Sequence, residues 1–170
     1  MTSAAAEAAE IIASRAGDRG RTVAVAESLT GGRLGATLAA APDAARWYRG
    51  AVTAYCPEVK QSVLSVPDVD PVSETCARAM ATAVCALLGA DLAIAVTGEA
   101  GPEPAGAAAV GTVWCAVCDG GVVDSWRLEL GGEPQPSPER IVARTVERVL
   151  VEVAGRISAR AAGRGGSASQ

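Results

Sequence analysis

The order of apolar and polar residues along the chain predicts alternating helices and strands. Residues 4–16 are strong helix formers, and Gly17 and Gly20 end that segment. Residues 22–26 form a short β-branched run that is typical of a buried strand. The same criteria predict further helices at 33–41, 57–64 and 73–88, and further strands at 47–55 and 92–96.

A hairpin signal lies in the second half of the chain. Asp119-Gly120-Gly121 separates two apolar segments, 110–118 and 122–130, and such a turn joins antiparallel strands. A last helix opens at Ser137 and Pro138, and its apolar residues fall on one face: Val142, Val146, Val149, Leu150 and Val153. Helices that alternate with strands, together with one antiparallel pair, predict an α/β domain with a mixed sheet covered by helices.

Length and composition favour one domain with an aliphatic core. A chain of 170 residues is typical of a single domain. Hydrophobic residues make up 49% of it, but it has no Phe and only 3% aromatic residues, so Val, Leu, Ile and Ala must fill the core. We assign residues 1–161 to the domain and expect the Gly-, Ser- and Arg-rich residues 162–170 to be a disordered tail.

Charge and hydropathy exclude several classes of function. The net charge is −4, and the chain has no basic cluster of the size that nucleic-acid binding needs. No apolar run reaches the roughly 20 residues of a membrane span. Residues 1–10 are alanine-rich with two glutamates and no basic residue, unlike a secretory or mitochondrial signal. We therefore expect a cytoplasmic protein that binds neither nucleic acid nor membranes.

The chain contains one lysine, Lys60, among 14 arginines, and it contains no histidine. Histidine is the usual proton-transfer group near neutral pH, and arginine does not lose its proton in proteins. Lysine can act as a base when its pKa is lowered. Composition alone leaves two interpretations open: Lys60 is required for chemistry, or it is a remnant of a general replacement of lysine by arginine.

The five cysteines do not form a recognisable metal or disulfide pattern. Cys115 and Cys118 match C-x-x-C, but they lie in a predicted strand, where residues three apart point to opposite faces. They cannot bind one metal ion together, so we interpret them as core residues. We expect no metal and no cofactor.

Three loops rich in small and polar residues each follow a short predicted strand, and ligands of α/β sheets bind at the carboxyl ends of strands. Ser28 to Gly32 combines hydroxyls with two glycines before a helix; an ordinary helix cap and turn is the simpler interpretation. Lys60 follows Tyr55 and Pro57, and a solvated surface lysine is the alternative there. Thr97 to Pro102 is either a ligand loop or a tight turn.

Five segments, in order and at matching spacing between about residues 4 and 153, resemble the CinA C-terminal domain family. The segment at 26–32 resembles the family's A-E-S-x-T-G-G, and the segment at 54–60 resembles T-Y-x-N-x-x-K. The remaining three segments resemble V-S-E, S/T-G-x-A-G-P and V-G-T-V-W, and they are Val72-Ser73-Glu74, Thr97-Gly98-Glu99-Ala100-Gly101-Pro102 and Val110-Gly111-Thr112-Val113-Trp114.

The resemblance implies a three-layer α/β/α domain, often a homodimer, of the nicotinamide mononucleotide deamidase type. Such an enzyme converts nicotinamide mononucleotide and water into nicotinate mononucleotide and ammonia. By position, Ser28 is the expected nucleophile and Lys60 its general base, with Tyr55 beside them. The expected substrate-binding residues are Thr30, Gly31, Gly32, Thr97, Gly98, Gly101 and Arg140.

Departures from the family pattern gather in the loops that are expected to form the site. Pro57 replaces an asparagine, and Glu99 places a carboxylate where an apolar residue is usual. Glu103-Pro104-Ala105 interrupts a glycine-rich segment, Ala108 and Ala109 replace Lys and Pro, and the G-D-R segment before the last helix is missing, with Arg140 as its possible substitute. Alternatives to the deamidase are therefore a catalytically impaired or repurposed homologue that binds a nucleotide or a partner protein, and an amidase for another small amide.

Overall fold

The computed structural model describes residues 3–104 and 106–165, with side chains up to residue 158. Its helices are α1 (Ser3–Gly17), α2 (Arg33–Ala39), α3 (Ala44–Trp47), α4 (Pro57–Leu64), α5 (Glu74–Leu88) and α6 (Pro138–Gly165). Its strands are β1 (Val23–Glu27), β2 (Tyr48–Thr53), β3 (Leu92–Gly98), β4 (Thr112–Asp119) and β5 (Val122–Glu129).

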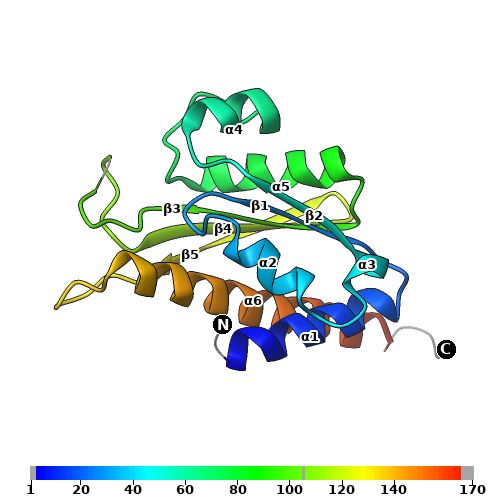
Figure 1. The fold of residues 1–170 in the computed structure, drawn as a ribbon. Helices are drawn as coiled ribbons and strands as arrows, with labels where there is room; N and C mark the ends of the chain where they lie inside the picture. Colours follow the sequence, from blue (N-terminus) through cyan, green and yellow to red (C-terminus); the bar gives the residue numbers. More distant parts are fainter. Residues whose placement is uncertain (1–2, 105, 166–170) are drawn as a thin grey trace.

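The strands form one mixed sheet in the order β2-β1-β3-β4-β5. Strand β1 pairs in parallel with β2 and β3, whereas β4 is antiparallel to both β3 and β5. Helices α4 and α5 lie on one face of the sheet, and α1, α2 and α6 lie on the other (Figure 1). The predicted three-layer α/β/α architecture with a mixed sheet is confirmed.

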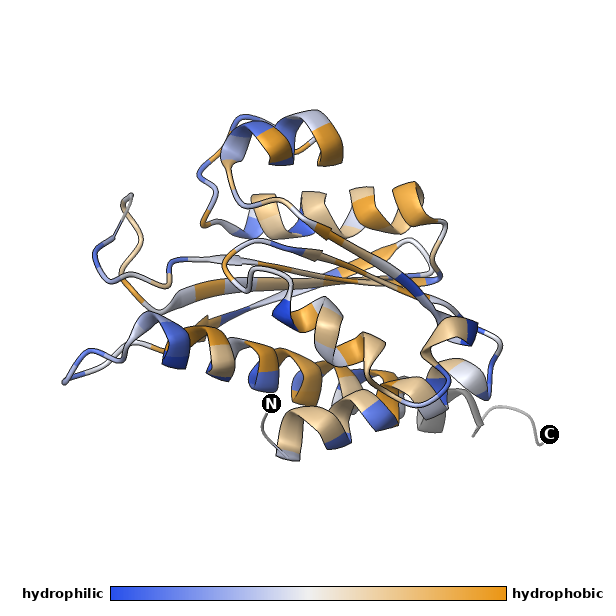
Figure 2. Ribbon diagram, viewed as in Figure 1, coloured by the Kyte–Doolittle hydropathy of each residue, from blue (hydrophilic) through white to orange (hydrophobic). Residues whose placement is uncertain are grey.

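Each face of the sheet has its own apolar core. The five residues of β1 are all buried, which explains its continuous small and apolar sequence. Side chains of β1 alternate between the two cores: Val23 and Val25 pack toward α1 and α6, and Ala24 and Ala26 pack toward α5. Figure 2 shows the apolar sides of the helices turned toward the sheet. The alanines of the second core let α5 approach the sheet closely.

The cysteine interpretation from the sequence is confirmed. Cys115 lies in the core under α1 and α6, and Cys118 lies in the core under α5. The two side chains of the C-x-x-C segment therefore point to opposite faces of β4. All five cysteines are free thiols in the structure.

Two predicted elements differ from the structure. The strand predicted at 47–55 is shorter because a turn of helix, α3, precedes it, and the Trp47 indole N–H donates to the Pro42 carbonyl over 2.9 Å. The last helix continues to Gly165, into the range predicted as a disordered tail, since its Arg and Ala residues are good helix formers. Residues 166–170 of that predicted tail lie outside the described residues.

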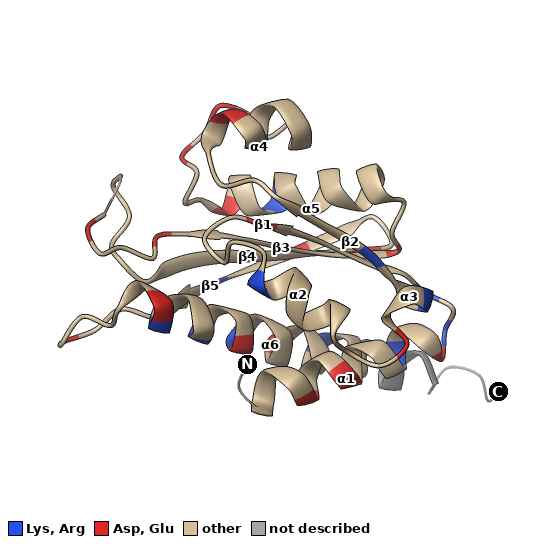
Figure 3. Cartoon of the chain, in the orientation of Figure 1, with Lys and Arg blue, Asp and Glu red and all other residues tan. Residues whose placement is uncertain are grey.

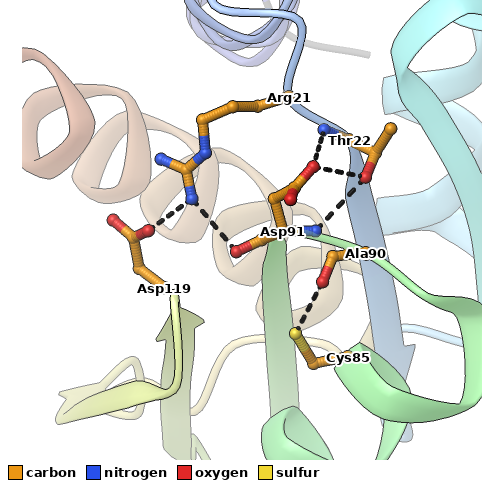
Figure 4. A network of polar contacts seen from close by, with 6 residues as sticks. All are labelled: Arg21, Thr22, Cys85, Ala90, Asp91 and Asp119. Atoms are coloured by element: carbon orange, nitrogen blue, oxygen red, sulfur yellow. Dashed lines mark hydrogen bonds and ion pairs between the residues drawn. The ribbon is translucent and has the colours of Figure 1, made fainter.

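A polar cluster fixes the end of the sheet where β1 and β3 begin (Figure 4). The Asp91 carboxylate accepts from both the backbone N–H and the hydroxyl of Thr22, each at 2.8 Å. Arg21 donates to the Asp91 carbonyl and pairs with Asp119. The hydrogen bonds from Thr22 hold the pKa of Asp91 below its ordinary value. This cluster sets the register of β1 beside β3, and therefore the positions of both carboxyl ends.

Among the described residues, no helix combines the length and apolar character that crossing a bilayer would require.

Candidate active site

The three loops singled out in the sequence meet at the edge of the sheet where the parallel strands end. The Ser28 backbone N–H donates to the carbonyl of Val96 over 3.1 Å, which joins the end of β1 to β3. The Ala54 N–H donates to the Glu27 carbonyl over 2.9 Å, which joins the chain after β2 to the end of β1. The parallel register thus brings the Ser28 loop, the Lys60 segment and the Thr97 loop to one place, where α/β domains commonly bind ligands.

Glu27 organises the Ser28 loop from below. Its side chain is fully buried, and its carboxylate accepts from the Thr30 hydroxyl at 2.6 Å, from the Leu34 N–H at 3.1 Å and from the Gly35 N–H at 3.0 Å. The Leu34 and Gly35 N–H groups belong to the first turn of α2. The hypothesis of an ordinary Ser/Thr cap is wrong, because the carboxylate before the loop caps the helix. The N–H groups of Leu34 and Gly35 at the start of the helix are therefore not free for a ligand, since Glu27 already binds both.

The two glycines of the loop have backbone conformations that favour glycine. Gly31 and Gly32 have φ values of 58° and 95°, and Gly32 is the N-cap residue of α2. A Cβ atom on Gly31 would meet no atom within 4 Å, so this part of the loop borders open space. The left-handed turn lets the chain reverse between Ser28 and the helix while its backbone stays accessible to a ligand.

Gly35 allows a close approach between α2 and β2. A Cβ atom there would lie 2.7 Å from the Tyr48 hydroxyl and 3.0 Å from Glu27 Oε1. Burial, followed by the charge of Glu27, raises the pKa of Tyr48 to about 12. The Tyr48 phenol is therefore neutral at physiological pH and remains a proton donor beside the Glu27 carboxylate.

Lys60 is buried, with 4% of its surface exposed, in contrast to the solvated lysine that was the alternative interpretation. Pro57 occupies the first turn of α4, and the Lys60 N–H donates to the Cys56 carbonyl over 3.2 Å, so the proline preserves the helix start. Burial lowers the pKa of the Lys60 amine from its ordinary value, while the nearby thiols of Cys76 and Cys56 act in the opposite direction. The environment thus favours the neutral amine that a general base requires.

Cys76 connects Lys60 to the Thr97 loop. Its side chain is fully buried in α5 and lies close to both the Lys60 amine and the Thr97 side chain. The Thr97 hydroxyl donates to the carbonyl of Pro71 over 2.6 Å. Thr97 thereby holds the chain before α5 against the end of β3, so its role in the site is structural.

Ser28 and Lys60 lie at the same edge without a direct hydrogen bond. Ser28 is 5% exposed, and neither its hydroxyl nor the Lys60 amine makes a hydrogen bond within the described part of the chain. Among the described residues, the Trp126 indole nitrogen is the fully buried side-chain polar atom that has no partner. Ser28 Oγ and Lys60 Nζ therefore still reach accessible space at the surface of the site.

The remaining residues predicted for the site differ in how exposed they are. Tyr55 is 72% exposed, outside the buried cluster, and Arg140 is exposed in the first turn of α6. A Cβ atom on Gly98 would lie 2.6 Å from the Thr112 carbonyl, so this glycine permits the close pairing of β3 with β4. Gly101 has a φ of 79° and precedes a cis peptide bond to Pro102.

Two residues of this site were missed by the sequence reasoning. Glu27 was quoted only as part of a motif, although a carboxylate eight residues before the glycine of a helix can cap that helix. The place of Cys76 in the first turn of α5 could have been predicted, because it stands three residues after the helix cap Ser73, whose side chain accepts its N–H. Its contact with Lys60 is tertiary and could not be predicted from spacing.

In the described ranges, no three His, Cys, Asp or Glu side chains are grouped closely enough to hold a metal ion.

A buried serine loop, a buried lysine and a glycine-rich loop at the carboxyl edge of a mixed sheet define an α/β/α domain with a candidate small-molecule site. The model of the CinA C-terminal domain matches residues 5–154. The chain belongs to the CinA C-terminal domain family.

Solved structures and sequence relatives agree with this assignment. The crystal structure of the competence damage-inducible protein A (ComA) from Klebsiella pneumoniae subsp. pneumoniae MGH 78578 is 34% identical, with a TM-score of 0.85 over 91% of this chain and 97% of that one. The competence/damage inducible protein CihA from Agrobacterium tumefaciens is 26% identical, with a TM-score of 0.85 over 93% of this chain and 98% of that one. A CinA-like protein from Gemmatimonas aurantiaca is 43% identical over 130 residues, which are 73% of this chain and 30% of the relative. The chain spans 24% to 33% of the length of three of the curated relatives that it matches.

Proposed function

We propose that the domain is an amidohydrolase of the nicotinamide mononucleotide deamidase type. The reaction converts the ring carboxamide of nicotinamide mononucleotide and water into nicotinate mononucleotide and ammonia. The observation that carries the proposal is the burial of Lys60, the one lysine of the chain, at the edge that also holds Ser28. A buried amine with a lowered pKa in a chain without histidine is suited to accept a proton from a serine hydroxyl.

In the proposed mechanism, the neutral Lys60 amine takes the Ser28 hydroxyl proton while Ser28 Oγ attacks the carboxamide carbon. The C–N bond of the tetrahedral intermediate then breaks, and the Lys60 ammonium gives its proton to the departing ammonia. Water hydrolyses the acyl ester on Ser28 with Lys60 again as base. Because Ser28 and Lys60 make no direct hydrogen bond in the structure, the mechanism requires that substrate binding draws them together.

The oxyanion of this intermediate needs preorganised donors. In the part of the chain that the structure describes, the backbone N–H groups of Leu29 and Thr30 make no hydrogen bond, whereas the neighbouring N–H of Gly31 donates to the Ser28 carbonyl. We assign the oxyanion to the Leu29 and Thr30 amides, which directly follow the nucleophile. The Thr30 hydroxyl is bound to Glu27, so Thr30 contributes to the site through its backbone.

The other proposed substrate-binding residues act through position or through charge. Gly31 and Gly32 keep the wall beside Ser28 open, and Gly98 and Gly101 shape the opposite loop. Thr97, Arg140 and Tyr55 complete the assignment: Thr97 supports the loop through Pro71, Arg140 supplies a positive charge at the rim, and Tyr55 supplies an exposed aromatic ring.

The proposal is tested by measuring ammonia release from nicotinamide mononucleotide by the purified chain. We expect turnover in the native chain and a loss of at least about a hundredfold in Ser28→Ala and in Lys60→Met, the range typical for removal of a catalytic acid–base group. Glu10→Gln on the exposed face of α1 serves as a control. Absence of ammonia release, in a chain whose circular dichroism shows it folded, contradicts the proposal and favours a repurposed binding domain.

A further inference from the structure

Glu99, which replaces the apolar residue usual at this position of the family, is hydrogen-bonded within the loop after β3 through both its backbone and its side chain. Its backbone is tied to the start of β4, since its N–H donates to the Thr112 carbonyl at 2.9 Å and its carbonyl accepts from Gly111 at 2.8 Å. Its side chain turns back into the loop, where Oε1 accepts the Gly101 N–H over 2.8 Å. The carboxylate therefore sits on a backbone amide of the glycine loop that borders the site.

The extended segment between Val96, which binds the Ser28 N–H, and Glu99 has about the span of a nucleotide. The Ser28 N–H is bonded to Val96, and Glu99 follows Val96 by three residues, which corresponds to about 10 Å along an extended chain. If the carboxamide lies at Ser28, the pyridine ring and the ribose extend across such a span. The phosphate, at the opposite end of the molecule, then reaches the loop that contains Glu99.

Backbone N–H groups of glycine loops are common binding groups for phosphate. Here the Gly101 amide already has an anionic partner from the same chain. A phosphate in this position must displace the Glu99 carboxylate or lie beside it, and like charges at close range disfavour binding. A second acidic residue, Glu103, is exposed in the same loop.

The other charges around this edge do not restore a strong positive field. Arg33 at the start of α2 and Arg140 at the start of α6 are exposed basic residues, and Arg33 interacts electrostatically with Glu139. Figure 3 shows red acidic segments on the loop after β3, and red next to blue at the start of α6. An anionic ligand therefore meets mixed charge rather than a basic pocket.

We propose that Glu99 is a specificity-determining residue that weakens binding of the mononucleotide's phosphate, so that the same site also accepts the unphosphorylated pyridine amide, the cationic nucleoside. This inference rests on the proposed function, because it places the reacting carboxamide at Ser28. The pyridinium cation is retained by both ligands, so the phosphate alone distinguishes them. Glu99 acts against the phosphate and leaves the amide chemistry at Ser28 and Lys60 unchanged.

The test compares nicotinamide riboside with nicotinamide mononucleotide on the full chain. Glu99→Gln is the informative variant, because its amide oxygen can still accept the Gly101 N–H while the charge is removed. Glu103→Gln removes an equal charge from the exposed part of the same loop and serves as the matched control. Affinities are measured by calorimetry in a Ser28→Ala background, and ammonia release is measured separately with Ser28 intact.

We expect the native loop to bind the riboside at least as tightly as the mononucleotide, and Glu99→Gln to raise the relative affinity for the mononucleotide about tenfold, an effect that added salt reduces. Glu103→Gln is expected to change this ratio by less than about twofold, since exposed charges interact weakly. Equal ratios in the native and Glu99→Gln chains overturn the proposal, and so does the absence of binding for both ligands. Binding with the expected ratio but without ammonia release supports the role of Glu99 and contradicts the proposed hydrolysis.

Discussion

Replacement of Glu27 by Gln tests whether one buried carboxylate organises the Ser28 loop. The Glu27 side chain is fully buried and accepts three hydrogen bonds, from the Thr30 hydroxyl and from the N–H groups of Leu34 and Gly35. Glutamine has nearly the same shape, but its NH₂ group donates where a carboxylate oxygen accepted. At least one buried N–H of α2 then faces a donor and has no acceptor.

The magnitude follows from these contacts. An unsatisfied buried N–H costs about 1–3 kcal/mol, and each of the remaining bonds loses the extra strength that a charged acceptor gives, about 1 kcal/mol. We expect Glu27→Gln to lower the free energy of unfolding by about 3–5 kcal/mol. This corresponds to a decrease in Tm of roughly 10–15 °C for a domain of this size.

Urea unfolding followed by tryptophan fluorescence measures this change. Glu10→Gln, at an exposed position of α1, is the matched control and should shift the free energy of unfolding by less than about 0.5 kcal/mol. Limited proteolysis should in addition cut the Ser28 loop faster in Glu27→Gln. A loss below about 1 kcal/mol would refute the reasoning, because it would mean that the loop and α2 do not depend on the carboxylate.

Three further predictions concern the same region. Burial lowers the pKa of Lys60, so its folded-state pKa lies below its unfolded value and stability rises with pH through that window; urea titrations at several pH values should show this rise in the native chain and a smaller one in Lys60→Met. Gly98→Ala should destabilise the fold by about 1–3 kcal/mol, since the new Cβ would lie 2.6 Å from the Thr112 carbonyl, and thermal unfolding checks this. Cys56 is the exposed cysteine and should react first with a thiol reagent at pH 8, whereas burial raises the pKa of Cys76 and makes it slow; a Cys56→Ser variant identifies the fast phase in a timed absorbance assay.

The sequence predicted the architecture well because each element carries a strong local signal. The bounds of α4 and the Ser73 cap of α5 were predicted from Pro57 and from the helix-cap pattern, and both are confirmed. The hairpin at Asp119-Gly120-Gly121 is also confirmed. The short helix α3 was missed because Trp47 and its neighbours lack a helical period, and the indole bond to Pro42 that stabilises this turn is not encoded in spacing.

The site was less predictable because its geometry depends on tertiary contacts. The burial of Lys60 follows from the packing of α4 over α5, and nothing in the local sequence distinguishes it from a solvated lysine. The role of Glu27 depends on how α2 folds back over β1. The contact between Cys76 and Thr97 joins α5 to β3, and it became visible only when both elements had been placed.

The survival of one lysine among 14 arginines can be tested as a chemical requirement with Lys60→Arg. If Lys60 were a remnant of compositional drift, arginine should serve equally well, since both side chains carry a positive charge on a long flexible stem. The guanidinium does not lose its proton at any accessible pH, so it cannot accept one from Ser28. A folded Lys60→Arg chain should therefore lose turnover as completely as Lys60→Met, while circular dichroism confirms that both are folded. Turnover within a few-fold of the native chain in Lys60→Arg would show that this lysine is not the base, and the nucleophile at Ser28 would then need a different partner.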